Sequence, residues 1–390
     1  MRHLYFDYAA STPVHPDVLK AMEPYFSQKF GNPGSLHYFG QEALKGVDGA
    51  RDAAANAIGA ESRQIFFTGS ATEANNWALR GTIKKFLENH PAIKEKPKII
   101  ISAFEHESIL ETAADLKKNG VQVEILKIKK DGFVDLARLK SLLDKQTILI
   151  SVMCANNEIG SIQPIKKISE IIKEFKKNSG YHYPLFHTDA VQALQFLDCN
   201  VDKLGVDLMS LSGQKIYGPK GIGCLYVKNR ALIAPFVTGG SQESGLRGGT
   251  LNVPAIVGFG KAIELIAAKR ESEGKRLQKL RDELLKNIKK IYPPAKLNGI
   301  LKDRLPNNLN IYFPDWCASD LLIKLDLYGL SVSAGAACTA RAAKPSHVIK
   351  ALGYSDERAS GSLRLTLGRP TTEKEIAEAI KIFREVLVRP

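Results

Sequence analysis

The sequence predicts an α/β protein built on a mostly parallel sheet, and three observations lead to this prediction. Short β-branched apolar runs alternate with amphipathic stretches of helical spacing through residues 64–227, a pattern typical of a parallel sheet covered by helices. The chain is 44% hydrophobic and 25% charged, which are globular proportions that supply a large core. Its 390 residues exceed one average domain, so we expect two lobes.

Seven apolar runs are expected to form the strands of the sheet: Gln64–Thr68, Lys98–Ser102, Gln122–Ile128, Thr147–Met153, Leu185–Asp189, Leu208–Ser210 and Cys224–Val227. Five amphipathic stretches between them are expected to form helices: Thr72–Asn89, Ser108–Asn119, Leu136–Lys145, Lys166–Asn178 and Ala190–Phe196. The repeated order of strand and then helix favours parallel strands, because each crossover needs a connecting helix.

A long charged segment after Pro254 predicts the end of the first lobe. Residues Ala255–Tyr292 have the pattern of one or two helices that carry the chain away from the sheet. Short strands near Asn307–Phe313 and Gly361–Thr366, and a closing helix from Thr372, then predict a smaller α+β lobe.

The chain is strongly basic, with 55 basic and 41 acidic residues and a net charge of +14. Such a surface attracts nucleic acid, anionic lipid or an acidic protein. Most basic residues lie in mixed-charge helical stretches such as Lys166–Lys177 and Lys269–Lys290, without interleaved aromatic residues. We interpret these stretches as solvated helix faces and expect no nucleic-acid partner.

The five cysteines include no CxxC pair, which argues against a disulfide framework and a zinc site and indicates a reducing, cytoplasmic setting. No stretch is apolar enough to cross a bilayer, and the N-terminus shows no secretory signal, so we expect no membrane partner.

Two polar motifs follow predicted strands. In Phe66–Ala74 (FFTGSATEA) a strand ends in a small-residue turn before a helix, an arrangement that suits a phosphate but also describes an ordinary helix cap. In His187–Gln192 (HTDAVQ), Asp189 stands at the carboxyl end of a strand, where ligands bind in open α/β sheets. A buried carboxylate there needs a cationic partner such as a protonated ring nitrogen, although Asp189 also suits a helix N-cap.

A third motif, Ser210–Gly223, places lysines in a polar, glycine-rich loop after a strand. A partly desolvated lysine forms an imine with a carbonyl cofactor, and Lys215 is our candidate, with Lys220 as a competitor. A phosphate-binding loop is the competing interpretation, but neither lysine has the Walker spacing of glycines.

A fourth motif, Ser333–Ala340 (SAGAACTA), places Cys338 among tiny residues that cannot pack a firm core. A cysteine in such a loop suits nucleophilic chemistry better than structure. The other four cysteines are interpreted as small apolar side chains of the core.

Together these motifs resemble the cysteine desulfurases that supply sulfur for iron–sulfur clusters. The resemblance is carried, in order, by FTGSATEANN, FEHES, ANNEIG, HTDAVQ, SGQKIYGPKGIG, RGGT, SAGAACTARAAKPSHV and SLRLTLGR. It begins at Tyr5–Pro13 and Gly31–Gly40 and continues to Arg369, nearly the whole chain. The long cysteine loop resembles that of the nitrogen-fixation and housekeeping group.

The resemblance implies a fold-type I pyridoxal 5′-phosphate enzyme of the class V aminotransferase group, with a mostly parallel seven-stranded sheet. It implies a large cofactor-binding domain at residues 14–258 and a small α+β domain, formed by 1–13 and 259–390, that carries the cysteine loop. Lys215 would hold the cofactor as an imine, Asp189 would pair with the protonated pyridinium nitrogen, and Gln192 would contact the ring hydroxyl.

The resemblance also assigns the remaining site residues. The phosphate would be held by Ala71, Thr72, Ser212 and Gln214, and by Thr250 of a neighbouring subunit, which implies a homodimer.

Three further roles follow from the same resemblance. His106 would stack on the cofactor ring and assist proton transfers, although a capped loop histidine is the plainer interpretation. Asn157 would lie near the ring and the substrate. Arg364 would bind the substrate carboxylate with its two-donor fork, and Arg369 competes with it for this role.

The implied reaction converts L-cysteine to L-alanine and leaves the sulfur on Cys338 as a persulfide. The implied partners are L-cysteine, a second copy of the chain, and an iron–sulfur scaffold protein or another persulfide acceptor. No resident metal is implied, although Cys338 would be available to share a cluster held on the scaffold.

One position departs from the resemblance, because Gln214 stands where the family usually has histidine, and glutamine brings no positive charge to the phosphate. Three alternatives stay open: a transaminase or other lyase, which would not use Cys338; a selenocysteine lyase, which would share every site residue; and a non-enzymatic nucleic-acid binder, suggested by the net charge alone.

Overall fold

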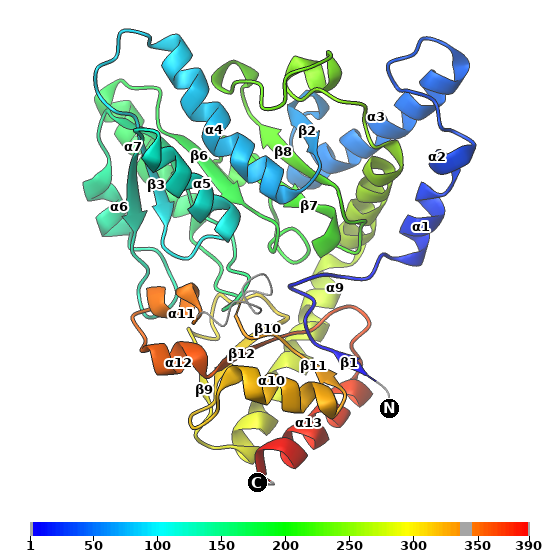
Figure 1. The fold of residues 1–390 in the computed structure, drawn as a ribbon, viewed down its shortest axis with the longest axis vertical. Helices are drawn as coiled ribbons and strands as arrows, with labels where there is room; N and C mark the ends of the chain where they lie inside the picture. The colour runs from blue at the N-terminus through cyan, green and yellow to red at the C-terminus, as the bar shows by residue number, and fades with distance from the viewer. Residues whose placement is uncertain (1–2, 336–344, 389–390) are drawn as a thin grey trace.

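The computed structural model describes residues 3–335 and 345–388, and Figure 1 shows their arrangement. The strands are β1 Leu4–Tyr5, β2 Ile65–Thr68, β3 Lys98–Ser102, β4 Gln122–Leu126, β5 Thr147–Ser151, β6 Leu185–Asp189, β7 Leu208–Ser212, β8 Gly223–Val227, β9 Lys296–Leu297, β10 Asn308–Tyr312, β11 Leu330–Ser331 and β12 Ser362–Thr366.

The α-helices are α1 Pro16–Met22, α2 Pro24–Ser27, α3 Tyr38–Ile58, α4 Ala71–Asn89, α5 Glu107–Lys118, α6 Leu136–Leu142, α7 Ile165–Ser179, α8 Val201–Leu204, α9 Val253–Ile291, α10 Ala318–Leu327, α11 His347–Ala351, α12 Asp356–Ser360 and α13 Glu373–Val388. Short 3₁₀ helices are η1 Ser62–Gln64, η2 Gly213–Lys215, η3 Arg230–Leu232 and η4 Gln242–Gly245.

Within the described residues, seven strands form the main sheet in the order β2-β8-β7-β6-β5-β3-β4. Only β8 runs antiparallel to its neighbours β2 and β7, and the other adjacent strands pair in parallel. The seven predicted strands and the mostly parallel sheet are therefore confirmed. The carboxyl ends of β5, β6 and β7 meet at one edge, where ligands bind in open α/β sheets.

Both faces of this sheet are buried except at the edge strand β4, and successive side chains of each strand point to opposite sides. Phe66 belongs with Ile99 to one hydrophobic cluster, whereas Ile65 and Phe67 belong with Ile100 to another. Helices cover each face, as in Figure 1, and this explains why the strands are continuous apolar runs.

Helix α9 joins this sheet to the rest of the chain as a single helix of 39 residues. It begins at Asn252, whose side chain accepts from the amide of Ala255. Its first half packs in the cluster with Phe67, through residues such as Phe259, and its second half packs in a separate cluster through residues such as Leu284. In Figure 1 it runs from the sheet down into the lower half of the molecule.

The lower half holds two small sheets. Strands β12, β10 and β9 form an antiparallel sheet, and β1 pairs in parallel with β11. Helices α10 and α13 pack here, with Leu4 and Phe6 in the same cluster as Leu363 and Phe383. Strand β1 therefore lies in the same half of the molecule as β12 and α13, as Figure 1 shows.

Two features differ from the sequence-based expectation. The helix predicted over Ala190–Phe196 is wrong: the Asp189 carboxylate accepts from the amide of Val191 (3.0 Å) and starts a series of turns instead. Several described helices were not predicted, and α3 and α10 are the longest of them; the three glycines of α3 weaken its helical signal. No described helix is both long and apolar enough to cross a membrane.

Candidate active site

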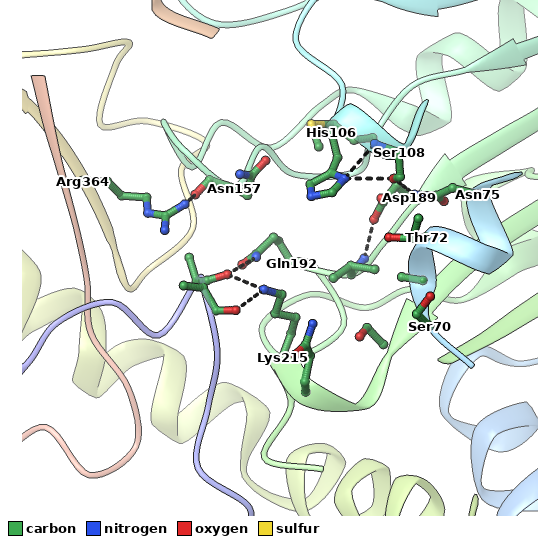
Figure 2. Close-up of a pocket in the computed structure, with 17 residues that line it drawn as sticks. Ser70, Thr72, Asn75, His106, Ser108, Asn157, Asp189, Gln192, Lys215 and Arg364 are labelled. Carbon is green, nitrogen blue, oxygen red and sulfur yellow. Dashed lines mark hydrogen bonds between the residues drawn. The ribbon is translucent and has the colours of Figure 1, made fainter. Parts of the chain in front are cut away.

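One pocket gathers most of the predicted site residues at the carboxyl edge of the main sheet (Figure 2). It is lined by Ala9, Ala10, Ser70, Ala71, Thr72, Asn75, His106, Ser108, Met153, Asn157, Asp189, Val191, Gln192, Ser212, Gln214, Lys215 and Arg364. These residues come from the ends of β6 and β7, the starts of α4 and α5, the N-terminal segment and β12. The site therefore joins both halves of the molecule.

Asp189 is a buried carboxylate at the end of β6, with 6% of its surface exposed. Its Oδ2 accepts from Asn75 Nδ2 at 2.8 Å, and its Oδ1 accepts from the amide of Val191. No described lysine, arginine or histidine forms a salt bridge with it. A buried carboxylate with only neutral donors suits a cationic ligand.

The turn before α4 is shaped by its own side chains. Ser70 is the N-cap and accepts from the amide of Glu73 (3.1 Å), and the Glu73 carboxylate accepts from the amide of Gly69 (2.8 Å). A Cβ at Gly223 would lie only 2.7 Å from the carbonyl carbon of Ser70 and 2.8 Å from the nitrogen of Ala71, so glycine lets β8 approach this turn closely. The helix cap and the pocket wall are thus the same residues.

His106 is the N-cap of α5, as the plainer interpretation predicted, and it also lines the pocket. Its Nδ1 accepts from the amide of Ser108 at 3.1 Å. An acceptor at Nδ1 leaves the proton of the neutral ring on Nε2. His106 therefore brings a proton donor to the pocket.

Glu105 directly precedes His106 in the chain and is fully buried. Its Oε1 accepts from the amide of Met153 (2.8 Å) and contacts the hydroxyl of Ser102, whereas its Oε2 has no partner among the described residues. Burial raises the pKa of Glu105 to about 8, and the Asp189 carboxylate adds to this shift. Glu105 is therefore a neutral acid at pH 7.

Lys215 ends η2, directly after β7, and its side chain enters the pocket. Its Nζ donates to the carbonyl of Ala9 at 2.9 Å and to the carbonyl of Ala10. Gln192 Nε2 donates to the same Ala9 carbonyl at 3.0 Å, and Figure 2 shows both side chains reaching this backbone. Lys220 is exposed and does not line the pocket, which favours Lys215 over its competitor.

Arg364 reaches the pocket from β12 with 1% of its surface exposed. Its Nη1 donates to the carbonyl of Asn157 (3.2 Å) and its Nη2 to Asp7 Oδ1 (2.7 Å). Arg369 lies elsewhere, donating through its Nη2 to the carbonyl of Leu265 (3.0 Å). Of the two arginines, Arg364 faces the site.

Of the remaining predicted site residues, Thr250 does not line this pocket and Cys338 cannot be placed relative to it. Thr250 is exposed and does not line the pocket of its own chain. Cys338 lies outside the described residues. The described residues on either side of its segment both lie near Glu158: Ser346 donates to Glu158 Oε2 (2.5 Å), and a Cβ at Gly335 would lie 3.6 Å from that oxygen.

Several pocket residues were missed by the sequence analysis. Asn75, Ser108 and the N-terminal Ala9 and Ala10 line the pocket, and Asp7 contacts Arg364. Asn75 carried a usable signal, because it lies one helical turn after the small-residue turn and so on the same helix face. The N-terminal residues carried no such signal, since their position depends on pairing with strands more than 300 residues away.

The family profile described as aminotransferase class-V matches residues 4–378. The chain belongs to this family. Class-V relatives include the cysteine desulfurase IscS of Dictyoglomus turgidum, which is 43% identical over 99% of this chain and 95% of its own length. The cysteine desulfurase IscS of Methanosarcina thermophila is 43% identical over 98% of this chain and 92% of its own length.

Solved structures of similar proteins agree with this class-V assignment. A NifS-like protein has a TM-score of 0.90 and 36% identity, with 99% of each chain covered. A structure titled SspA in complex with cysteine has a TM-score of 0.80 and 35% identity, covering 93% of this chain and 98% of the other. The resemblance found in the sequence and the predicted fold are confirmed.

Proposed function

We propose that this protein is a pyridoxal 5′-phosphate-dependent cysteine desulfurase, which converts L-cysteine to L-alanine and passes the sulfur to Cys338. Full-length similarity to proteins named cysteine desulfurase IscS supports the activity. The observation that carries the cofactor is Asp189, a buried carboxylate whose only described donors are neutral, beside Lys215 in one pocket.

The pocket residues fit pyridoxal 5′-phosphate at both ends. A protonated pyridinium nitrogen would supply the cation that Asp189 lacks, and Asn75, which donates to Asp189, would keep the carboxylate in place. At the other end, the start of α4 presents unpaired backbone N–H groups at Ala71 and Thr72, and helix starts of this kind bind phosphate. Ser212 and Gln214 line the same pocket and would add side-chain donors.

When bound, pyridoxal 5′-phosphate supplies an aldehyde that reacts with amines and a ring that withdraws electrons from the substrate Cα. The amine of Lys215, which donates to two backbone carbonyls, would bond that aldehyde and receive the Cα proton. His106 would donate a proton from Nε2, the nitrogen that its Ser108 contact leaves protonated. Arg364 and Asn157 would hold the substrate carboxylate.

The transfer of sulfur needs no reactant other than L-cysteine and Cys338. The Cys338 thiolate attacks the sulfur of L-cysteine, an S–S bond forms as the C–S bond breaks, and alanine leaves with a proton at its former C–S carbon. Cys338 then carries the persulfide. The described residues Gly335 and Ser346, on either side of Cys338 in the sequence, lie beside Glu158, the neighbour of the pocket residue Asn157, and this supports the assignment.

The test measures alanine and persulfide formed from L-cysteine by the holoenzyme and by Cys338→Ala. Cys317→Ala is the matched control, because Cys317, contrary to its interpretation as a core side chain, is the one exposed cysteine among those the structure describes. We expect equimolar products from the parent and from Cys317→Ala, and no persulfide from Cys338→Ala. Full activity of Cys338→Ala would refute the assigned nucleophile, and an inactive parent with bound cofactor would refute the substrate.

We further propose that the active unit is a homodimer in which Thr250 completes the phosphate site of the partner subunit. Thr250 is exposed on its own chain. A set of apolar side chains between residues 19 and 39 is also exposed, and Leu36 is 94% exposed. The set is Leu19, Phe26, Phe30, Leu36, Tyr38 and Phe39. Light scattering would give twice the chain mass for the parent, and a Leu36→Asp monomer would bind the cofactor more weakly.

We also propose two domains, a persulfide acceptor and a cytoplasmic setting for this protein. The proposed domains are 14–258, and 1–13 with 259–390, and the clustering of Leu4 with Phe383 apart from the main sheet supports a separate small domain, although Phe259 and Ile266 of α9 still pack in the cluster of the main sheet. A scaffold protein for iron–sulfur clusters, in the cytoplasm, is the proposed acceptor. The proposed acceptor is tested by cluster formation on such a scaffold from L-cysteine without added sulfide. We expect this cluster formation to require Cys338.

A further inference from the structure

Asp7 is an acidic residue of the N-terminal segment that contacts the pocket without lining it. Its Oδ1 accepts from Arg364 Nη2 at 2.7 Å, and its side chain is 15% exposed. Arg364 is the one arginine that lines the pocket among the residues the structure describes. The carboxylate of Asp7 therefore influences the orientation of the Arg364 guanidinium.

The backbone around Asp7 is fixed to β12, the strand that carries Arg364. Asp7 forms a parallel bridge with Thr366, whose amide donates to the carbonyl of Phe6 at 2.7 Å. The amide of Ala9 donates to Thr366 Oγ1 at 2.9 Å, and the hydroxyl of Tyr5 donates to the carbonyl of Asp7 at 3.0 Å. These bonds on both sides of Asp7 leave its carboxylate little freedom.

The guanidinium of Arg364 has donors to spare. A guanidinium carries five N–H groups, and here one is bonded to the Asn157 carbonyl and one to Asp7. The Nε atom is buried and has no partner among the described residues. A buried N–H without an acceptor is costly, so the site is built to receive another acceptor, and a carboxylate matches the fork of donors.

We propose that Asp7 is a positioning residue that determines specificity for a free substrate carboxylate. This inference rests on the proposed function of Arg364 in binding L-cysteine. Two anchors, Asp7 and the Asn157 carbonyl, fix the plane of the guanidinium, so its remaining donors are oriented before the substrate arrives. Removing one anchor lets the plane rotate, and the two-point contact with the carboxylate is lost.

A competing role for Asp7 predicts the opposite sign. If Asp7 served only to neutralise Arg364, removing its charge would make the pocket more positive and would strengthen the binding of anionic substrates. Positioning predicts weaker binding of carboxylates after the same change. The isosteric substitution Asp7→Asn distinguishes the two.

The experiment compares the parent holoenzyme with Asp7→Asn and with Asp17→Asn. Asp17 is the matched control, because it is a nearby aspartate with a 61% exposed side chain outside the pocket. Steady-state kinetics give kcat and KM for L-cysteine, and spectroscopic titration gives the dissociation constants of L-alanine and L-alaninamide. The amide lacks the carboxylate and reports any general damage to the pocket.

For Asp7→Asn we expect KM for L-cysteine and the dissociation constant of L-alanine to rise about tenfold, the loss typical of one hydrogen bond to a charged group. We expect kcat to change less than twofold and alaninamide binding to stay unchanged. Asp17→Asn should behave as the parent. Tighter alanine binding, an unchanged preference for alanine over alaninamide, or a fall in kcat alone would overturn the proposal.

Two further comparisons separate a wrong role for Asp7 from a variant that does not fold and from a wrong proposed activity. If Asp7→Asn does not fold, Asp7→Glu keeps the charge but shifts the carboxylate, and the same loss of preference for alanine over alaninamide is expected. A parent that binds alanine but releases none from L-cysteine would refute the proposed desulfurase activity, whereas the alanine and alaninamide titrations would still decide the role of Asp7.

Discussion

The substitution Glu105→Gln should make the stability of the folded protein depend less on pH. Glu105 is fully buried behind His106, and burial raises the pKa of its carboxyl from 4.5 to about 8. The carboxyl therefore stays protonated in the folded chain at pH 7, while the unfolded chain ionises it. Glutamine has the same shape, can replace the neutral acid and does not ionise.

The sign and size follow from proton linkage. Between pH 4.5 and 8 the folded state holds a proton that the unfolded state has released, so rising pH favours unfolding in this window. Each pKa unit corresponds to about 1.4 kcal/mol, and the Glu105 contribution falls by about 2.5 kcal/mol between pH 5 and pH 7. The Gln variant lacks this contribution, and its stability should decline less over the same range.

Urea unfolding at pH 5, 6 and 7 measures this difference. The chain has two tryptophans, and a Trp316→Phe background leaves Trp77, which is fully buried against the main sheet, as the reporter. Both proteins keep His187, a buried histidine whose pKa is lowered to about 3, so its titration cancels in the comparison. Parallel pH profiles for the two proteins would refute the assignment of a neutral Glu105.

Three further predictions concern the cofactor site and its support. Asn75→Ala should weaken pyridoxal 5′-phosphate binding, measured by absorbance titration, because Asp189 loses its 2.8 Å donor; an unchanged affinity would contradict this. Gln214→His should tighten cofactor binding severalfold by adding positive charge near the phosphate, and an equal dissociation constant would show that the departure is compensated. Glu243→Gln should cost about 3 kcal/mol in urea unfolding, because it breaks a buried pair with Arg51 (2.6 Å), whereas the exposed-pair control Glu271→Gln should not move the midpoint.

Six of the seven strands of the main sheet carry a clear local signal, because each is a short run of residues buried on both faces, whereas the edge strand β4 is largely exposed or half-buried. The predicted Leu208–Ser210 lies within β7, and Lys98–Ser102 matches β3. The helices α4 and α5 were also recognisable from their spacing of apolar residues. The turns at residues 190–196 were not, because one side-chain bond from Asp189 redirected a stretch that has helical composition.

The site was predictable where its chemistry is local and hidden where it depends on the fold. Lys215 and Asp189 stand in distinctive motifs at strand ends, so residue type and position together identified them. Their contacts were not readable, since the Lys215 amine is held by carbonyls some 205 residues away in the chain. The spacing of residues in the sequence does not indicate such a long-range contact.

The N-terminal segment shows why the two halves of the chain must fold together for this site to exist. The amide of Thr12 donates to the carbonyl of Gln214 at 3.0 Å, and its Oγ1 accepts from the amide of Tyr217 at 2.8 Å, so Thr12 bonds one residue before and two residues after Lys215. Asp7, five residues earlier, holds Arg364 of β12. One short stretch thus contacts the loop of the amine proposed to bind the cofactor and the guanidinium proposed to bind the substrate. A change in either contact should alter the geometry of both, which makes this segment part of the proposed active site although it carries no reactive group.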